Sequence, residues 1–133
     1  MSNSDSKILT QWEKRVKLTK FFYTYLIKFN IGIDINKEAI EDFNLDAEQL
    51  KVFEYFLNNK SKIIDLINEN TNKNWDCSRL NLVDQAVLFE TYSESKVLNT
   101  NKHILIDQAL ITIKKYSDYD NYKYINAILD KIL

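Results

Sequence analysis

The residues of this 133-residue chain that could bind a polyanion lie near its start, where basic residues alternate with aromatic ones. Residues 1–30 contain six Lys or Arg against two Asp or Glu, although the formal charge of the whole chain is −1. Lys and Arg pair with phosphates, and neighbouring Tyr or Phe rings stack on unpaired bases. The pattern is compatible with nucleic-acid binding, but from the residues alone a solvated helix face backed by core aromatic residues is the favoured interpretation.

A second group of lysines and tyrosines lies near the end of the chain. Its members are Lys114, Lys115, Tyr116, Tyr119, Tyr122, Lys123 and Tyr124. They cannot all be buried on one stripe of a helix, so some of the tyrosines face solvent. Exposed tyrosines beside lysines suit contacts with single-stranded RNA or with a protein. Tyrosines that face solvent without a role are the alternative.

Residues for catalysis or metal binding are few. A single cysteine, Cys77, excludes an intrachain disulfide and a multi-cysteine zinc or iron–sulfur site. A single histidine, His103, is expected in the first turn of a helix, and Gly32 stands alone, which excludes a glycine-rich phosphate loop. We therefore expect no enzyme, no cofactor and no metal site. A helical enzyme is the least favoured interpretation.

The elements that must position these residues are predicted to be helices throughout, because apolar residues recur at spacings of three and four. The expected helices cover about residues 7–29, 37–43, 47–68, 78–95, 103–115 and from 122 onward. Ser6 and Asn36 are expected N-caps, and Asp46 with Gln49 forms a capping-box pattern. The pair Asn58-Asn59 either kinks or divides the third helix.

The predicted fold class is therefore all-α. A chain with one glycine and no proline lacks the turn formers of a many-turned β-sandwich or barrel. The length suits one domain over residues 1–133, and a polar break separates two packed sub-bundles of about 7–70 and 75–133. No apolar run is long enough to span a membrane, and the polar N-terminus lacks the apolar run of a secretory signal. We expect a cytoplasmic protein without membrane contact.

Three motifs in the second half share the order and spacing of one known family. They read WDCSRLNLVDQAVL from residue 75, IDQAL from 106, and KKYSD from 114 followed by KYINAILDKI from 123. These segments resemble the NusB family, whose usual wording is close to W-x-x-x-R-L-x-x-V-D-R-A-I-L-R and K-F-V-N-G-V-L-D-K-I. Earlier in the chain, Arg15 followed by FYTY from residue 22 is similar to the family's first helix.

The resemblance implies a NusB-like helical bundle of two packed three-helix sub-bundles and a role in transcription antitermination. NusB proteins pair with NusE, a ribosomal small-subunit protein, bind the boxA element of nascent rRNA transcripts, and join an antitermination complex on RNA polymerase. By matching positions, the RNA-binding residues would be Lys14, Arg15, Lys17, Tyr116 and Lys123. The residues on the NusE side would be Tyr23, Asp84, Asp120 and Tyr124.

The chain departs from the family pattern mainly at charged positions. The arginine-rich start of the first helix is thinned, because Gln11, Trp12 and Glu13 precede Lys14. Gln85 also replaces the usual basic residue after the VD pair. Each lost cation removes a phosphate contact. A protein–protein adaptor on the NusB fold, with little or no RNA binding, is therefore the alternative function.

Overall fold

The structure, a computed structural model, describes residues 8–35, 37–71 and 76–133, and all regular elements within them are helical. The α-helices are α1 (Gln11–Asn30), α2 (Lys37–Phe43), α3 (Ala47–Glu69), α4 (Leu82–Val97), α5 (Lys102–Tyr116) and α6 (Tyr122–Ile132). Two short 3₁₀ helices are η2 (Cys77–Arg79) and η3 (Tyr119–Asn121). The predicted all-α class is confirmed.

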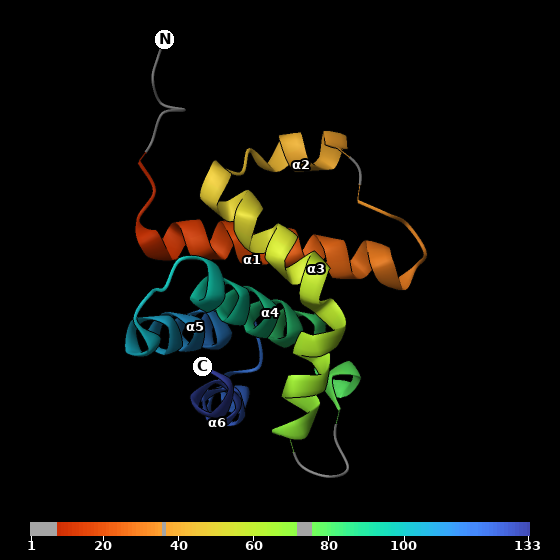
Figure 1. The fold of residues 1–133 in the computed structure, drawn as a ribbon. Helices are drawn as coiled ribbons and strands as arrows, with labels where there is room; N and C mark the ends of the chain where they lie inside the picture. Colours follow the sequence, from red (N-terminus) through yellow and green to blue (C-terminus); the bar gives the residue numbers. More distant parts are fainter. Residues whose placement is uncertain (1–7, 36, 72–75) are drawn as a thin grey trace.

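The helix α4 lies at the centre of the molecule. It packs against α1, α3, α5 and α6, and Figure 1 shows α1 and α3 crossing on one side of it and α5 and α6 on the other. This position follows from the two adjacent apolar rows of its sequence, which bury most of its circumference. One continuous core joins buried residues from Leu18 in α1 to Ile132 in α6. The division into sub-bundles of about 7–70 and 75–133 stays a prediction.

Aromatic side chains make up much of the core between α1, α3 and α4. The ring centroids of Phe21 and Phe53 are 4.7 Å apart in an edge-to-face arrangement. Phe56 lies 4.9 Å from Phe89 of α4, so the ring cluster joins three helices. Such pairs stabilise a core beyond the area that they bury. The core holds α1 firmly, and α1 carries the basic residues of interest.

The helix α1 begins at Gln11, four residues later than the sequence pattern suggested. Thr10 caps it: the Thr10 hydroxyl accepts a hydrogen bond from the Glu13 amide at 3.1 Å, and the Glu13 carboxylate accepts one from the Thr10 amide at 3.0 Å. This reciprocal capping box is written in the sequence as T-Q-W-E. The expected caps Ser6 and Asn36 lie outside the described residues.

The remaining boundaries follow their caps. The predicted capping box of Asp46 and Gln49 is confirmed, and α3 continues without division past Asn59. The helix α4 starts at Leu82 and not at residue 78, because the side chain of Asn81 accepts a hydrogen bond from the Asp84 amide at 2.8 Å. Gly32 has a φ of +79°, the left-handed conformation expected after α1. None of the described helices is long and apolar enough to cross a membrane.

Candidate nucleic-acid and partner interface

A groove of about 240 Å³ runs between α1, α4 and α5. Its lining residues are Val16, Thr19, Lys20, Tyr23, Val83, Ala86, Thr112 and Tyr116. The apolar residues come mainly from α1 and α4, while Tyr23 of α1 and Tyr116 of α5 are exposed by 37% and 42%. The groove therefore offers an apolar floor with two accessible phenol rings, a combination that fits a flat ring or an apolar side chain. We call it the tyrosine groove.

Lysines lie beside the rings of the tyrosine groove. The Lys20 Nζ is 5.5 Å from the ring centroid of Tyr116, and the Lys115 Nζ is 5.4 Å from the same centroid. Lys115 also lies 5.1 Å from the ring of Trp12, whose Nε1 donates a hydrogen bond of 3.0 Å to the Thr112 hydroxyl. These separations are within the range of cation–π attraction. Positive charge is thus held next to an exposed ring.

The arrangement continues along η3 and the start of α6. The Lys114 Nζ is 4.3 Å from the ring centroid of Tyr122 and 5.6 Å from that of Tyr119. Tyr119 and Tyr122 pack edge to face at 5.7 Å, and Tyr119 is 58% exposed. Together with Lys123, an exposed residue 6.0 Å from the Tyr122 ring, these residues extend the cationic and aromatic surface. We call the set Lys114, Lys115, Tyr116, Tyr119, Tyr122 and Lys123 the lysine–tyrosine surface.

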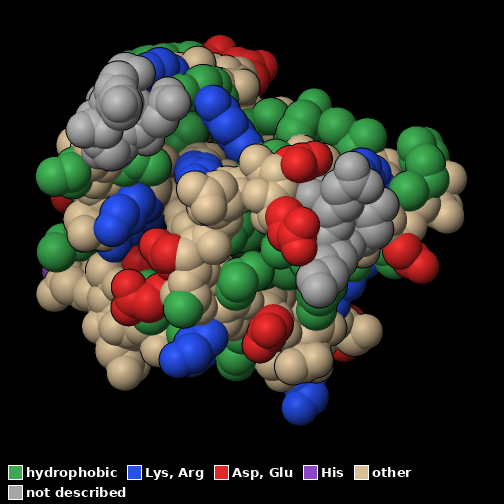
Figure 2. All heavy atoms as spheres, turned by 90° about the horizontal axis from the view of Figure 1, so that it is seen from above, with side chains coloured by type: hydrophobic (Ala, Val, Ile, Leu, Met, Phe, Trp, Pro, Cys, Tyr) green, Lys and Arg blue, Asp and Glu red, His purple; other side chains and the backbone are tan. Residues whose placement is uncertain are grey.

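The basic residues of α1 do not all face this surface. Lys20 turns toward Tyr116, whereas the Lys17 Nζ donates a hydrogen bond of 2.8 Å to the Asn44 carbonyl, at the end of α2. Lys14 lines a different cavity, between α1 and α3. On the face drawn in Figure 2, Lys and Arg side chains are interspersed with Asp and Glu. The positive excess of the first 30 residues is therefore spread over more than one side of α1.

Arg15 is held inside the fold by side chains from α4 and α5. Its Nε lies 3.0 Å from both carboxylate oxygens of Glu94, its Nη2 lies 2.9 Å from Glu94 Oε2, and its Nη1 donates to the Gln108 amide oxygen. The Arg15 and Glu94 side chains are 16% and 4% exposed. A guanidinium engaged in this way joins α1 to α4 and α5, and it is turned away from solvent.

Asp84 is also buried, at 1% exposure. Its Oδ1 accepts a hydrogen bond of 2.7 Å from the Ser117 hydroxyl, and its Oδ2 accepts one of 2.8 Å from the Asn121 side-chain amide. Burial raises the pKa of the Asp84 carboxyl although these two hydrogen bonds lower it. The carboxylate therefore ties the segment between α5 and α6 to the start of α4. That segment carries part of the lysine–tyrosine surface.

The other residues expected on the partner side differ in exposure. Tyr23 lines the tyrosine groove, and Asp120 is exposed in η3. Tyr124 is half-buried, and burial raises the pKa of its phenol. Of the four expected residues, Tyr23 and Asp120 are thus accessible for direct contact, whereas Asp84 is buried and Tyr124 is half-buried.

Trp12 was not expected at the site from the sequence, and Lys20 and Lys115 were expected only as members of the two groups of basic and aromatic residues. A signal was present for the first two: Trp12, Val16 and Lys20 follow at intervals of four residues, which places them in one row of a helix. That row faces α5, where Thr112, Lys115 and Tyr116 meet it.

Chemistry at the remaining candidate residues is limited by their surroundings. Cys77 is buried, and burial raises the pKa of its thiol to about 12, so a thiolate nucleophile is disfavoured at neutral pH. His103 is exposed at the start of α5. Within the described residues, no group of three or more His, Cys, Asp or Glu is placed to hold a metal ion.

Sequence comparisons place the chain among known proteins. The sequence model of the NusB family matches residues 7–133. The transcription antitermination protein NusB of Borreliella burgdorferi is 31% identical over 119 residues, covering 77% of this chain and 84% of that protein. The corresponding protein of Finegoldia magna is 31% identical, covering 81% and 85%. That of Treponema denticola is 39% identical over 98 residues, covering 73% and 71%.

Solved structures agree with this placement at the level of the fold. The structure of T. maritima NusB superposes with a TM-score of 0.81 at 22% identity, covering 95% of this chain and 92% of that one. A chain from the crystal structure of a plectonemic RNA supercoil gives a TM-score of 0.68 at 21% identity, covering 92% and 94%. At these identities the similarity shows a shared helical architecture.

Proposed function

The chain belongs to the NusB family, and from this membership we propose that it is an RNA-binding transcription antitermination factor. In this proposal it pairs with NusE and binds boxA-type single-stranded RNA of nascent rRNA transcripts. It thereby joins the antitermination complex on RNA polymerase and supports rRNA synthesis in the cytoplasm. It acts by positioning RNA and protein, and no reaction step is required.

The observation that carries the proposal is the lysine–tyrosine surface beside the tyrosine groove. Single-stranded RNA is bound by rings that stack on its unpaired bases and by cations that follow its phosphates. Tyr116 supplies an exposed ring, and Lys20 and Lys115 lie within 5.5 Å of its centroid. A base stacked on Tyr116 would therefore have two cations nearby for its phosphates.

We assign the contacts to RNA as follows. Tyr116 stacks on a base, and Lys123 extends the phosphate contacts along the start of α6. Lys14 and Lys17 hold phosphates of a strand that continues over α1, for which the Lys17 ammonium must leave the Asn44 carbonyl. Arg15 supports this surface from within through Glu94, since its guanidinium is already engaged.

The contacts to NusE use the accessible members of the expected set. Tyr23 anchors the partner in the tyrosine groove, and Asp120 pairs with a basic side chain of the partner. Asp84 and Tyr124 stabilise this face from the inside, Asp84 through its hydrogen bonds to Ser117 and Asn121. RNA and partner surfaces then meet at the groove that Tyr23 and Tyr116 share.

The deciding experiment is a titration of a boxA-like RNA with the full chain, with and without NusE. Tyr116→Ala is expected to weaken RNA binding about tenfold, because one stacked base contributes about 1–3 kcal/mol. Tyr116→Phe is the matched control, since it keeps the ring and should stay within about twofold of the unsubstituted chain. Equal affinities for the alanine and phenylalanine variants would contradict the assignment of Tyr116.

One observation favours the adaptor function as the second candidate. The arginine that matches the family's basic helix, Arg15, is bound to Glu94 and Gln108, and Gln11 and Glu13 precede it where cations are usual. An adaptor would bind NusE with unchanged affinity whether or not RNA is present, and it would give no shift of boxA RNA. The titration above separates the two functions.

A further inference from the structure

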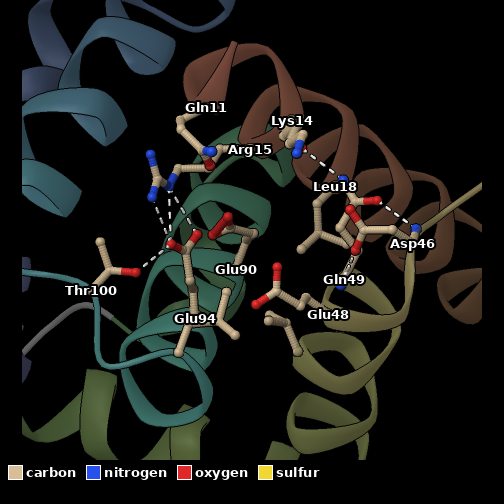
Figure 3. A pocket seen from close by; sticks show the side chains of 12 residues that line it. Gln11, Lys14, Arg15, Leu18, Asp46, Glu48, Gln49, Glu90, Glu94 and Thr100 are labelled. Atoms are coloured by element: carbon tan, nitrogen blue, oxygen red, sulfur yellow. Dashed lines mark hydrogen bonds and ion pairs between the residues drawn. The ribbon is translucent and has the colours of Figure 1, made fainter. Parts of the chain in front are cut away.

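Several charged side chains that line the cavity of about 310 Å³ between α1, α3 and α4 are engaged with other groups of the protein. In Figure 3 the Arg15 guanidinium reaches the Glu94 carboxylate, and the Asp46 carboxylate accepts the Gln49 amide as the cap of α3. A ligand in this cavity would compete with these contacts. The lysine–tyrosine surface differs, because most of one of its side chains, Tyr119, is open to solvent.

Tyr119 is the most exposed of the eight tyrosines, at 58%, and the RNA contacts proposed above do not include it. It lies at the start of η3, between α5 and α6. Tyr116, the proposed stacking residue, is exposed by 42%. A single exposed ring is common on protein surfaces, so what matters is how the ring is held and which charges lie beside it.

The ring of Tyr119 is held by Tyr122 without being covered. The two ring centroids are 5.7 Å apart with an interplanar angle of 63°, which is an edge-to-face contact. Tyr122 packs against the hydrophobic core, so it supports the neighbouring ring from the inside. Because the edge of a ring covers at most one face of its partner, at least one face of Tyr119 is not covered by Tyr122. A flat base can lie on that face.

The backbone around Tyr119 is also tied to the rest of the fold. The Ser117 hydroxyl, two residues earlier, donates to the Asp84 carboxylate at 2.7 Å, and the Asn121 side-chain amide, two residues later, donates to it at 2.8 Å. Because Asp84 is buried in α4, both hydrogen bonds hold the segment against the centre of the bundle. A ring on a fixed segment loses less conformational freedom when a ligand binds, and this strengthens binding.

Lysines lie beside both rings of this pair. The Lys114 Nζ is 5.6 Å from the ring centroid of Tyr119 and 4.3 Å from that of Tyr122, and the Lys123 Nζ is 6.0 Å from the Tyr122 centroid. Both lysines are exposed. A base that stacks on Tyr119 would bring its phosphate near these ammonium groups. Rings combined with cations in this way are how proteins bind single strands.

Two carboxylates in the same segment reduce the attraction to phosphate without reversing it. The Asp118 carboxylate accepts the Asp120 amide at 3.2 Å as the cap of η3, and both residues are exposed. Residues 114–123 contain three lysines and two Asp, so their net charge is +1. Stacking of a base on a ring does not itself depend on net charge.

Tyr119 repeats the arrangement found at Tyr116. The Lys115 Nζ lies 5.4 Å from the Tyr116 centroid, and the Nζ of its neighbour Lys114 lies 5.6 Å from the Tyr119 centroid, so each ring has a lysine beside it. Three residues of chain span at most about 11 Å, so one short stretch of a strand can reach both rings. An RNA strand fits this repeat better than a protein segment does, because each successive nucleotide offers one base and one phosphate.

We propose that Tyr119 stacks on a second unpaired base of the bound RNA, with Lys114 at the adjacent phosphate. This inference rests on the proposed function and deepens it, because the surface then binds two bases of one strand, one on Tyr116 and one on Tyr119. Tyr122 is a positioning residue that supports the Tyr119 ring. The ligand is a single-stranded segment, since bases paired in a duplex are not free to stack on either ring.

The test is a titration of a fluorescein-labelled boxA-like RNA with the full chain and NusE, followed by anisotropy at a fixed salt concentration. Tyr119→Ala should weaken RNA binding about fivefold or more, because the stacking of one base is lost. Tyr119→Phe keeps the ring and is the matched control, expected within about twofold of the unsubstituted chain. Equal affinities for the two Tyr119 variants would overturn the proposal.

Abasic RNAs show whether the Tyr119 ring touches a base. Each nucleotide is replaced in turn by an abasic ribose, which removes the base and keeps the phosphate. One of these RNAs should bind the unsubstituted chain about fivefold more weakly, whereas Tyr119→Ala should bind it as well as it binds the intact RNA. Tyr116→Ala should give the same result at a different nucleotide. A purely structural role of Tyr119 would leave every abasic effect in place, and that outcome would refute the stacking assignment.

Salt dependence separates the ring from the lysine beside it. Lys114→Gln removes one phosphate contact, so the slope of log K against log salt concentration should become less steep by about 0.7. Tyr119→Ala should lower the affinity and leave this slope unchanged, because a stacked base releases no counterions. An unchanged slope in Lys114→Gln would contradict the phosphate contact of Lys114.

The variants of Tyr116 and Tyr119 distinguish this inference from the proposed function. Normal RNA binding by Tyr119→Ala, together with weakened binding by Tyr116→Ala, would refute the second stacking residue and leave the proposed function intact. A loss of affinity for NusE in Tyr119→Ala, measured without RNA, would assign Tyr119 to the protein partner and would also overturn the inference. Absence of RNA binding by the unsubstituted chain would defeat both.

Discussion

Arg15 shows how a single residue can combine a basic side chain with a structural role. Its guanidinium joins α1 to Glu94 of α4 and Gln108 of α5, at an exposure of 16%. Removing one partner of a mostly buried ion pair leaves the other charge without compensation. Arg15→Gln is therefore expected to lower the free energy of unfolding by about 3 kcal/mol, measured by urea denaturation.

The control for this prediction is Arg79→Gln. Arg79 is exposed in η2, and exposed substitutions usually change stability by less than about 0.5 kcal/mol. Similar effects of the two substitutions would show that the pair with Glu94 does not stabilise the fold.

Glu90 makes stability depend on pH. Burial raises its pKa in the folded protein well above the ordinary value of 4.5, so the folded state holds a proton that the unfolded state has released. The contribution of Glu90 is complete below the unfolded pKa and is lost as the pH rises through the folded pKa. Urea unfolding between about pH 5 and 9 should therefore show stability falling with pH, and less steeply in Glu90→Gln.

The pKa of Asp84 is also raised, so Asp84 makes stability fall with pH in the unsubstituted chain and in Glu90→Gln alike. It therefore cancels in their difference, which isolates Glu90. Parallel pH profiles for the two proteins would mean that Glu90 is ionised in the folded state.

The spacing of residues along one helix does not predict whether a single side chain is exposed, because its exposure depends on partners far away in the sequence. Sequence alone marks Arg15 as a cation on a basic helix, but its partner Glu94 lies 79 residues away. The same holds for Asp84, whose position in a family motif gives no sign that Ser117 and Asn121 occupy both of its oxygens. Long-range contacts set the exposure of a side chain, and one sequence does not contain them explicitly.

At the scale of the elements, capping residues decide where helices begin. The Thr10–Glu13 box satisfies two backbone N–H donors at the start of α1, which carries the basic residues. Thr10→Ala should lower the free energy of unfolding by about 1 kcal/mol, the usual effect of removing such a cap. Thr24→Ala is the control, because the Thr24 hydroxyl bonds the Lys20 carbonyl inside the same helix. Thermal unfolding of the two variants would compare them, and equal losses would contradict the capping role.

The start of a helix could be predicted from the sequence where the capping residue and the first residue of the apolar stripe indicated the same position. The capping-box pattern of Asp46 and Gln49 predicts the start of α3, and α3 begins at Ala47. At α1 the apolar stripe begins with Leu9, before the cap at Thr10, so the apolar pattern predicted a helix start that is too early. At α4 two capping residues, Asp76 and Asn81, follow closely, and the second one starts the α-helix after a short 3₁₀ turn.

For the whole molecule, a net charge of −1 means that RNA binding must rely on local lysines. Three phosphate contacts to a single strand would give a slope of about −2 in a plot of log K against log salt concentration. Fluorescence anisotropy of a labelled boxA-like RNA between low and moderate salt measures this slope. A flat plot would show that the lysines do not contact phosphate, and it would favour the adaptor function.

The overall fold was more accessible from sequence than the site was. Apolar periodicity along α4, α5 and α6 survives the changes in charge, and it is enough to indicate an all-helical protein. The tyrosine groove needed the structure, because Trp12 and Lys20 of α1 meet Thr112 and Tyr116 of α5 only after the chain has folded. Residues that meet across the whole bundle leave no local pattern.

The distance along the chain between α1 and its partners affects how the protein is made. Trp12 bonds to Thr112, 100 residues later, so α1 leaves the ribosome long before its contacts on α5 exist. Until then the side of α1 that meets α5, which includes Trp12 and Arg15, lacks these partners. The nascent chain therefore depends on late translation for its first helix to dock, and a stall before α5 emerges would leave an apolar helix open to chaperones.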